Sequence, residues 1–225
     1  MPKTMRFDLH AHTNRSIDGA RSPATMVRAA KEKGLDGIAI TDHDSVAGWK
    51  EAEKAGKECG IIVIRGEEIT VYKGKRPTAH VLGLFLKKSV KAKTMPEVAE
   101  EIHRQGGLAV AAHPLDRWRG RYAELEKYIG YFDAIEVMNS HTPFWGDNRR
   151  AREFARKNRK AVTGGSDAHI KHEVGFCYTE AKARNLAEFK KALLNGETEA
   201  YGRKTEPIYH VFALLSKIGL YPRDK

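Results

Sequence analysis

The sequence predicts an α/β protein with one domain, residues 1–225, built as a small or incomplete β/α barrel. Short, nearly continuous apolar segments alternate with amphipathic segments, which is typical of parallel strands joined by helices. Six or seven such units in 225 residues fall short of the ~250 residues of an eight-unit barrel. An open doubly wound sheet is disfavoured, because the first strand ends in His-Ala-His instead of a glycine-rich phosphate turn.

The elements follow one another in a regular order. The predicted strands cover residues 6–10, 37–41, 61–65, 79–85, 108–112, 133–138 and 161–165. The predicted helices cover residues 22–33, 46–58, 95–105, 121–128, 146–157, 186–194 and 207–217. Ser22 caps the first helix and Pro23 suits its first turn, while Gly34 ends it. We expect one face of the last helix to pack on the barrel, through Val211, Phe212, Leu215 and Ile218.

Composition excludes several classes of protein. The chain is 41% hydrophobic and 31% charged, and no apolar run approaches the ~20 residues of a membrane-spanning helix. Cys59 and Cys177 stand alone, which excludes a disulfide scaffold and a cysteine zinc site. The N-terminal residues lack the apolar stretch of a secretory signal. We therefore expect a cytoplasmic protein with no membrane partner, and its net charge of +11 favours phosphorylated or nucleic-acid partners.

Six of the ten histidines lie at the ends of predicted strands. His10 and His12 are two residues apart, so their side chains share one face, and the others are His43, His80, His113 and His169. Acidic residues occupy the same positions: Asp18, Asp42, Asp44, Glu68 and Asp167. The carboxyl ends of barrel strands meet at one mouth. Imidazole and carboxylate together suit zinc, manganese or iron, so the sequence predicts a metal site at that mouth.

The other four histidines have weaker contexts. His141 and His172 fall in loops that we expect near the mouth, within reach of a substrate. His103 and His210 fall in predicted helices, where surface or packing roles are the ordinary expectation.

The motifs DLHAHT, ITDHD, GEEIT, AHVLG, AAHP and GSDAH occur in the order seen in the polymerase-and-histidinol-phosphatase (PHP) superfamily. They span residues 8–169, and the chain resembles a small stand-alone metal-dependent phosphoesterase of that superfamily. The resemblance implies a distorted (β/α)7 TIM-like barrel of the PHP type. It also implies a di- or trinuclear site for phosphoester hydrolysis, with two to three divalent ions: zinc, manganese or iron, or alternatively magnesium.

By matched motif positions, the resemblance implies three groups of metal ligands. The first metal would be bound by His10, His12, Glu68 and Asp167. Glu68 would bridge to a second metal, which His80 and His113 would also bind. The third metal would be bound by Asp18, His43 and His169.

Two features of this pattern bear on the ligand assignment: the adjacent acids Glu67 and Glu68, and the aspartate at position 18. The family pattern Gly-x-Glu selects Glu68 over Glu67, and neighbours on a strand face opposite ways. Asp18 stands where many relatives carry histidine, and small nucleotide phosphoesterases of the family share an aspartate there.

The expected chemistry follows from the metals. Metal coordination lowers the pKa of bound water from ~15.7 toward ~7, which supplies a hydroxide nucleophile without a protein base. His169 and Asp42 are the candidates for protonating the leaving alcohol. His169 is better supported as a ligand, and Asp42 has the alternative role of orienting a ligand histidine.

Two loops combine basic and aromatic residues. Residues 114–122 carry the candidate substrate contacts Arg117, Trp118, Arg119 and Arg121. Arginine binds phosphate oxygens and tryptophan offers a face for base stacking. The loop at residues 139–150 carries Phe144 and Trp145, and both loops have the alternative role of capping the barrel.

The favoured function is hydrolysis of a small phosphomonoester, with a nucleotide as the preferred substrate. Two enzymatic alternatives are a nuclease that trims short oligonucleotides and a histidinol-phosphate phosphatase, the latter disfavoured by the short chain and Asp18. A noncatalytic barrel that serves as an assembly module is the alternative from a different class. The sequence leaves the oligomeric state open.

Overall fold

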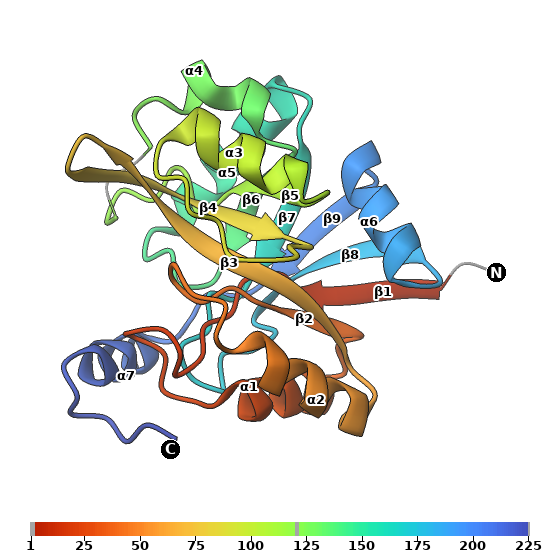
Figure 1. The fold of residues 1–225 in the computed structure, drawn as a ribbon, viewed down its shortest axis with the longest axis vertical. Helices are drawn as coiled ribbons and strands as arrows, with labels where there is room; N and C mark the ends of the chain where they lie inside the picture. Colours follow the sequence, from red (N-terminus) through yellow and green to blue (C-terminus); the bar gives the residue numbers. More distant parts are fainter. Residues whose placement is uncertain (1–2, 120–121, 225) are drawn as a thin grey trace.

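The computed structural model describes residues 3–119 and 122–224 (Figure 1). Within these residues a nine-stranded sheet forms a nearly closed barrel, in the order β7-β6-β5-β4-β3-β2-β1-β8-β9. The strands are β1 (Lys3–Asp8), β2 (Gly37–Ile40), β3 (Ile62–Lys73), β4 (Arg76–Leu84), β5 (Leu108–Ala111), β6 (Ala134–Asn139), β7 (Ala161–Gly165), β8 (Cys177–Ala183) and β9 (Thr198–Gly202). The segments that follow β1 and β7 meet through a parallel bridge between Ala11 and Ala168.

The sheet is mixed, which corrects the expectation of parallel construction throughout. β1, β2 and β3 pair in parallel, as do β5, β6 and β7. An antiparallel hairpin of β3 and β4 joins these two parallel groups, and Gly74 has a φ of +62° at its turn. β8 and β9, which were not predicted, add antiparallel strands beside β1.

The helices lie outside the barrel. They are α1 (Pro23–Glu32), α2 (Trp49–Cys59), α3 (Met95–Arg104), α4 (Leu125–Tyr128), α5 (Trp145–Lys157), α6 (Leu186–Asn195) and α7 (Pro207–Lys217), with a 3-10 turn at Ile129–Tyr131. Ser22 caps α1 as predicted, since its hydroxyl accepts a hydrogen bond from the Thr25 amide at 3.2 Å. α1 and α2 cover one side of the sheet, and α3, α4 and α5 cover the other (Figure 1). No helix in the described segments is long and apolar enough to cross a membrane.

The interior of the barrel changes character along its length. Phe7, Ile64, Leu82 and Val110 form an apolar core at one end, which α6 closes by placing Phe189 against Phe7 with ring centroids 4.2 Å apart. Side chains two or four residues further along a strand face the same way. Three strands that contribute to this apolar core also have a polar side chain on the same inward face, nearer the mouth. These side chains are Glu68 on β3, His80 on β4 and Glu136 on β6. The alternation of the strands therefore positions the site.

Candidate metal centre

His10 and His12 come directly after β1, where the chain leaves the sheet. Ala11 lies between them, and its carbonyl accepts a hydrogen bond from the Thr41 amide at 2.9 Å. Both histidines are buried, and their Nε2 atoms lie 3.2 Å apart. The Nδ1 atom of His10 lies 2.9 Å from Glu136 and that of His12 lies 3.3 Å from the Ser16 hydroxyl. These contacts leave both Nε2 atoms available to a metal.

The Glu68 carboxylate lies at the centre of the histidine cluster. Its oxygens are within 3.2 Å of ring nitrogens of five histidines: His10, His12, His43, His80 and His113. Burial opposes its ionisation, but the surrounding histidines hold the pKa of Glu68 well below its usual range. A buried anion with five imidazoles around it is a suitable bridging ligand between two cations.

Asp167 follows β7 and lies beside the histidine cluster. Its Oδ1 lies 3.2 Å from His12 Nε2, and its Oδ2 lies 2.6 Å from Arg119 Nη1. The Asn139 side-chain amide donates to the same Oδ2 at 3.2 Å. Burial opposes ionisation, but Arg119 and His10 hold the pKa of Asp167 well below its usual range. The carboxylate is therefore ionised, with one oxygen facing the histidines.

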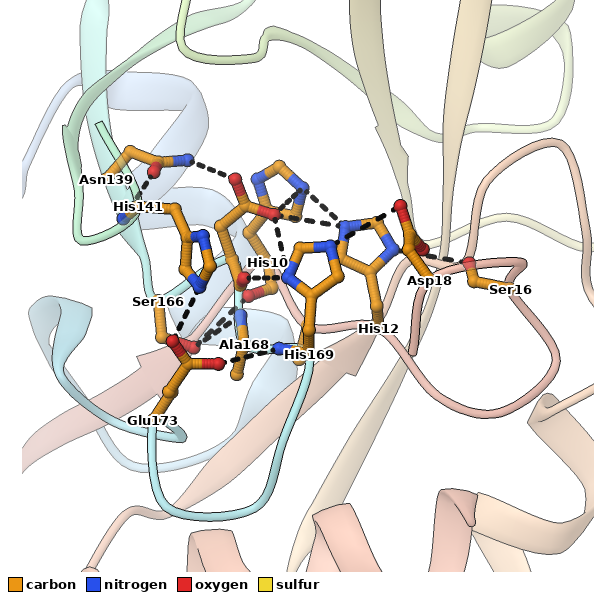
Figure 2. Close-up of polar contacts among 12 residues, drawn as sticks. His10, His12, Ser16, Asp18, Asn139, His141, Ser166, Ala168, His169 and Glu173 are labelled. Atoms are coloured by element: carbon orange, nitrogen blue, oxygen red, sulfur yellow. Dashed lines mark hydrogen bonds and ion pairs between the residues drawn. The ribbon is translucent and has the colours of Figure 1, made fainter. Parts of the chain in front are cut away.

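Asp18 lies beside His43 and His169, and Figure 2 draws Asp18 and His169. Its Oδ2 is 3.4 Å from His43 Nε2 and 3.5 Å from His169 Nε2. His169 uses its Nδ1 toward the Asp167 carbonyl at 2.7 Å, so Nε2 is the nitrogen that faces Asp18. Asp18 Oδ1 is buried and has no hydrogen-bond partner in the described part of the chain. A cation at this position would satisfy that oxygen.

The donor set fits divalent metals. The structure brings all nine predicted ligands together, and four groups among them have ligand atoms within 4.8 Å of one another. These groups are His10, His12 and Asp167; Glu68, His80 and His113; His12, His43 and Glu68; and His12, Asp18 and His169. Three carboxylates and six imidazoles are the kinds of ligand that zinc, manganese and iron accept.

The other predicted site residues differ in whether they contact the cluster. Asp42 is buried, and both its oxygens accept hydrogen bonds from Thr13, at 2.6 Å from the amide and 2.8 Å from the hydroxyl. Among the described residues of the 114–122 loop, Arg119 contacts the cluster through Asp167. Arg117 instead pairs with Asp147 at 3.0 Å, and Trp118 is 77% exposed at the rim. Arg121 lies outside the described residues.

Two acidic residues beside the cluster, Glu136 and Glu173, were not predicted from the sequence, whereas His141 was expected near the mouth. Glu136 binds His10 and also accepts a hydrogen bond from the His113 amide at 2.7 Å. Its signal was an acidic residue inside the otherwise apolar run AIEVM. His141 is buried, and its Nε2 lies against the Glu173 carboxylate (Figure 2). His210 was expected to have a surface or packing role, yet its ring lies 4.6 Å from that of His141.

Comparison with known proteins agrees with this geometry. The family model of the PHP domain matches residues 8–213. The chain belongs to the PHP family. Its relatives include proteins named as a phosphatase and a phosphodiesterase, so the chain is a hydrolase that acts on phosphoester bonds.

The sequence is similar to several curated proteins. It is 34% identical over 154 residues to an uncharacterised protein of Methanocaldococcus jannaschii, covering 61% of this PHP chain and 83% of the relative. It is 42% identical over 87 residues to a 5′-3′ exoribonuclease of Haemophilus influenzae, covering 38% of the chain and 31% of the relative. It is 29% identical over 178 residues to a 3′,5′-nucleoside bisphosphate phosphatase of Chromobacterium violaceum, covering 74% of the chain and 58% of the relative.

Solved structures share the fold. A two-domain protein of Bacteroides vulgatus containing a predicted PHP-like metal-dependent phosphoesterase matches 90% of the PHP chain and 66% of its own, with a TM-score of 0.73 and 24% identity. A lesion-specific endonuclease of Pyrococcus furiosus matches 88% of the chain and 58% of its own, with a TM-score of 0.62 and 19% identity.

Proposed function

We propose that this PHP protein hydrolyses a small phosphomonoester, with a nucleotide as the preferred substrate, at a di- or trinuclear metal centre. The position of Arg119 carries the proposal. Its guanidinium contacts Asp167 within the cluster, and the residue lines two cavities, one on each side of the cluster. An arginine fixed at this place would bind the oxygens of a phosphate.

The residues that would hold the metals form three groups. His10, His12, Glu68 and Asp167 would hold the first, Glu68, His80 and His113 the second, and Asp18, His43 and His169 the third. The bound metals would supply Lewis acidity toward the phosphoryl oxygens and would acidify water. The buried carboxylates balance part of the metal charge and leave the site attractive to an anion.

The remaining residues would orient the ligands. Glu136 and Ser16 would hold the rings of His10 and His12 so that Nε2 faces the metals. Asp42 would fix the loop after β1 through Thr13, and we assign it this positioning role in preference to proton donation. We assign His169 the role of a ligand, since its Nε2 faces Asp18.

A nuclease is the second candidate, and the two cavities favour it. A phosphodiester has a chain on each side of the phosphorus, and cavities flank the cluster on both sides of Arg119. The similarity to an exoribonuclease supports the same reading. A strong loss of activity between about 50 and 200 mM salt would be expected for an oligonucleotide and not for a small monoester.

A substrate screen tests the proposal. We expect purified protein with added Mn²⁺ or Zn²⁺ to release phosphate from nucleoside monophosphates or bisphosphates. Arg119→Ala should lower kcat/KM at least about 100-fold, because it removes a charge-assisted phosphate contact and leaves Asp167 without its cation. Preference for short oligonucleotides would favour the nuclease, and inactivity on every phosphoester would contradict both.

A further inference from the structure

We propose that an apolar cavity beside the cluster binds the flat, apolar part of the substrate, such as a nucleobase, and that α7 is its specificity element. This inference rests on the proposed function, because it concerns the group that carries the phosphate. It assigns a role to a helix that the sequence predicts only to pack on the barrel.

The cavity has a volume of about 580 Å³, within the ~300–1,000 Å³ of small-molecule sites. Two kinds of residue line it. Those nearest the metal cluster are polar: Asp18, Arg119, His141 and His169. The others include the apolar side chains Trp118, Pro143, Phe144, Val211, Ala213 and Leu214. An occupant that matches both sets carries an anionic group and an apolar group.

A row of imidazole rings connects the cavity to the cluster. The rings of His12 and His169 have centroids 4.7 Å apart, those of His169 and His141 are 4.9 Å apart, and those of His141 and His210 are 4.6 Å apart. His210 belongs to α7. Two ring-to-ring contacts therefore separate His210 of α7 from His169, a proposed metal ligand. One nucleotide is long enough to span this separation.

The segments on both sides of α7 hold it in this position. Before the helix, the Thr205 amide donates to the Ser140 carbonyl at 2.9 Å. After it, Arg223 donates to the Asn14 carbonyl at 3.0 Å, and Asp224 accepts from the Ser22 amide at 2.9 Å. Asn14 and Ser22 flank Asp18 in the loop after β1. These bonds tie α7 to the walls of the site.

Four of the six apolar side chains that line this cavity are exposed. Trp118 is 77% exposed, Phe144 46%, Val211 47% and Leu214 59%. The exposure of Val211, and of Ile218 at 57%, corrects the expectation that these residues pack on the barrel. The Arg117 guanidinium lies 4.5 Å from the Phe144 ring centroid and holds that ring in place. A planar base would cover this surface and remove it from water.

Two substrates that share a phosphate but differ in the base test the inference. We expect adenosine 5′-monophosphate to be hydrolysed with a higher kcat/KM than ribose 5-phosphate. Leu214→Ala should lower kcat/KM for the nucleotide about tenfold and change the value for ribose 5-phosphate less than about twofold. Ile218→Ala is the matched control: it removes an equally exposed side chain, 57% against 59%, that does not line the cavity. It should change neither value.

A binding measurement separates this inference from the proposed function. Adenosine has no phosphate, so saturation-transfer NMR of its base protons reports on the cavity without catalysis. A signal that Leu214→Ala removes and Ile218→Ala retains would support the inference even if no phosphoester is hydrolysed. Absence of a signal in the wild type would overturn the inference and leave the proposed hydrolysis intact. The same holds if Leu214→Ala lowers kcat/KM equally for adenosine 5′-monophosphate and ribose 5-phosphate. A dimer that Leu214→Ala dissociates in sedimentation would assign the surface to a second copy and would also overturn it.

Discussion

The carboxylates of Glu67 and Glu68 lie on opposite faces of β3. Glu68 faces the histidine cluster, whereas Glu67 accepts hydrogen bonds from the Ser89 hydroxyl at 2.9 Å and the Val90 amide at 2.8 Å. Successive side chains of a strand alternate between its faces, so only one of the two acids can reach the barrel interior. The separation favours Glu68 as the proposed metal ligand, whereas Glu67 fixes the segment after β4.

Glu68→Gln should remove metal and activity together. The substitution takes away the negative charge that five histidines surround, so we expect kcat/KM to fall at least about 100-fold and the bound metal to fall by at least one ion per chain. Glu67→Gln is the matched control and should keep kcat/KM within about threefold, with a loss of about 1 kcal/mol in the free energy of unfolding. The reverse ranking would show that Glu67 is the ligand.

Glu136→Gln should weaken metal binding without abolishing it. Glu136 orients the His10 ring and binds the His113 amide, and loss of such a partner typically costs about 10–100-fold in metal affinity. Activity measured against Mn²⁺ concentration should therefore shift to higher metal and recover at saturation. Glu180→Gln, on β8 and paired with Arg6, is the control and should not shift the curve. Loss of activity that excess metal does not recover would assign Glu136 a direct role in catalysis.

Asp18→Ala should reduce activity less than His10→Ala. Asp18 contacts only His43 and His169 among the proposed ligands, whereas His10 lies against both Glu68 and Asp167. If the third metal binds phosphate, the loss should appear chiefly in KM, and excess metal should recover part of it. No effect of Asp18→Ala under limiting metal would show that the third site is unused.

Much of this site is predictable from local sequence. The His-Ala-His spacing puts both rings on one side, and every predicted strand is present within a few residues of its expected position. The strand at residues 61–65 extends to Lys73, because Gly66, Glu67 and Glu68 continue its alternation into the hairpin. The β/α reading missed this hairpin, since antiparallel pairing depends on the partner strand.

Other features depend on tertiary structure. In β8 the large polar residues Tyr178, Glu180 and Lys182 alternate with buried residues, which is typical of a strand with one exposed face. Its place beside β1 depends on long-range pairing. The predicted helix at residues 121–128 is reduced to Leu125–Tyr128. The apolar face of α7 suggests packing, but the hydrogen bonds of Thr205, Arg223 and Asp224 that tie its flanking segments to the site depend on residues far away in the sequence.

The half-buried His210 should make stability depend on pH. Burial, together with the nearby His141, lowers its pKa to about 4 from an ordinary value near 6.5. As the pH falls, the unfolded chain binds this proton first, so the stability that His210 contributes above pH 6.5 is lost toward pH 4. In urea titrations with a chelator present, the wild type should lose about 1–2 kcal/mol more than His210→Gln between pH 7 and pH 5. Equal losses would show that His210 is not held neutral by the fold.

Elemental analysis of the purified protein tests the central claim most directly. Nine side chains converge from separate strands and loops, and their three carboxylates and six imidazoles provide ligands for two to three divalent ions. We predict two to three ions of zinc, manganese or iron per chain, with phosphoesterase activity that a chelator removes and added Mn²⁺ or Zn²⁺ restores. A protein that holds no metal and gains no activity on addition of either ion would contradict the account.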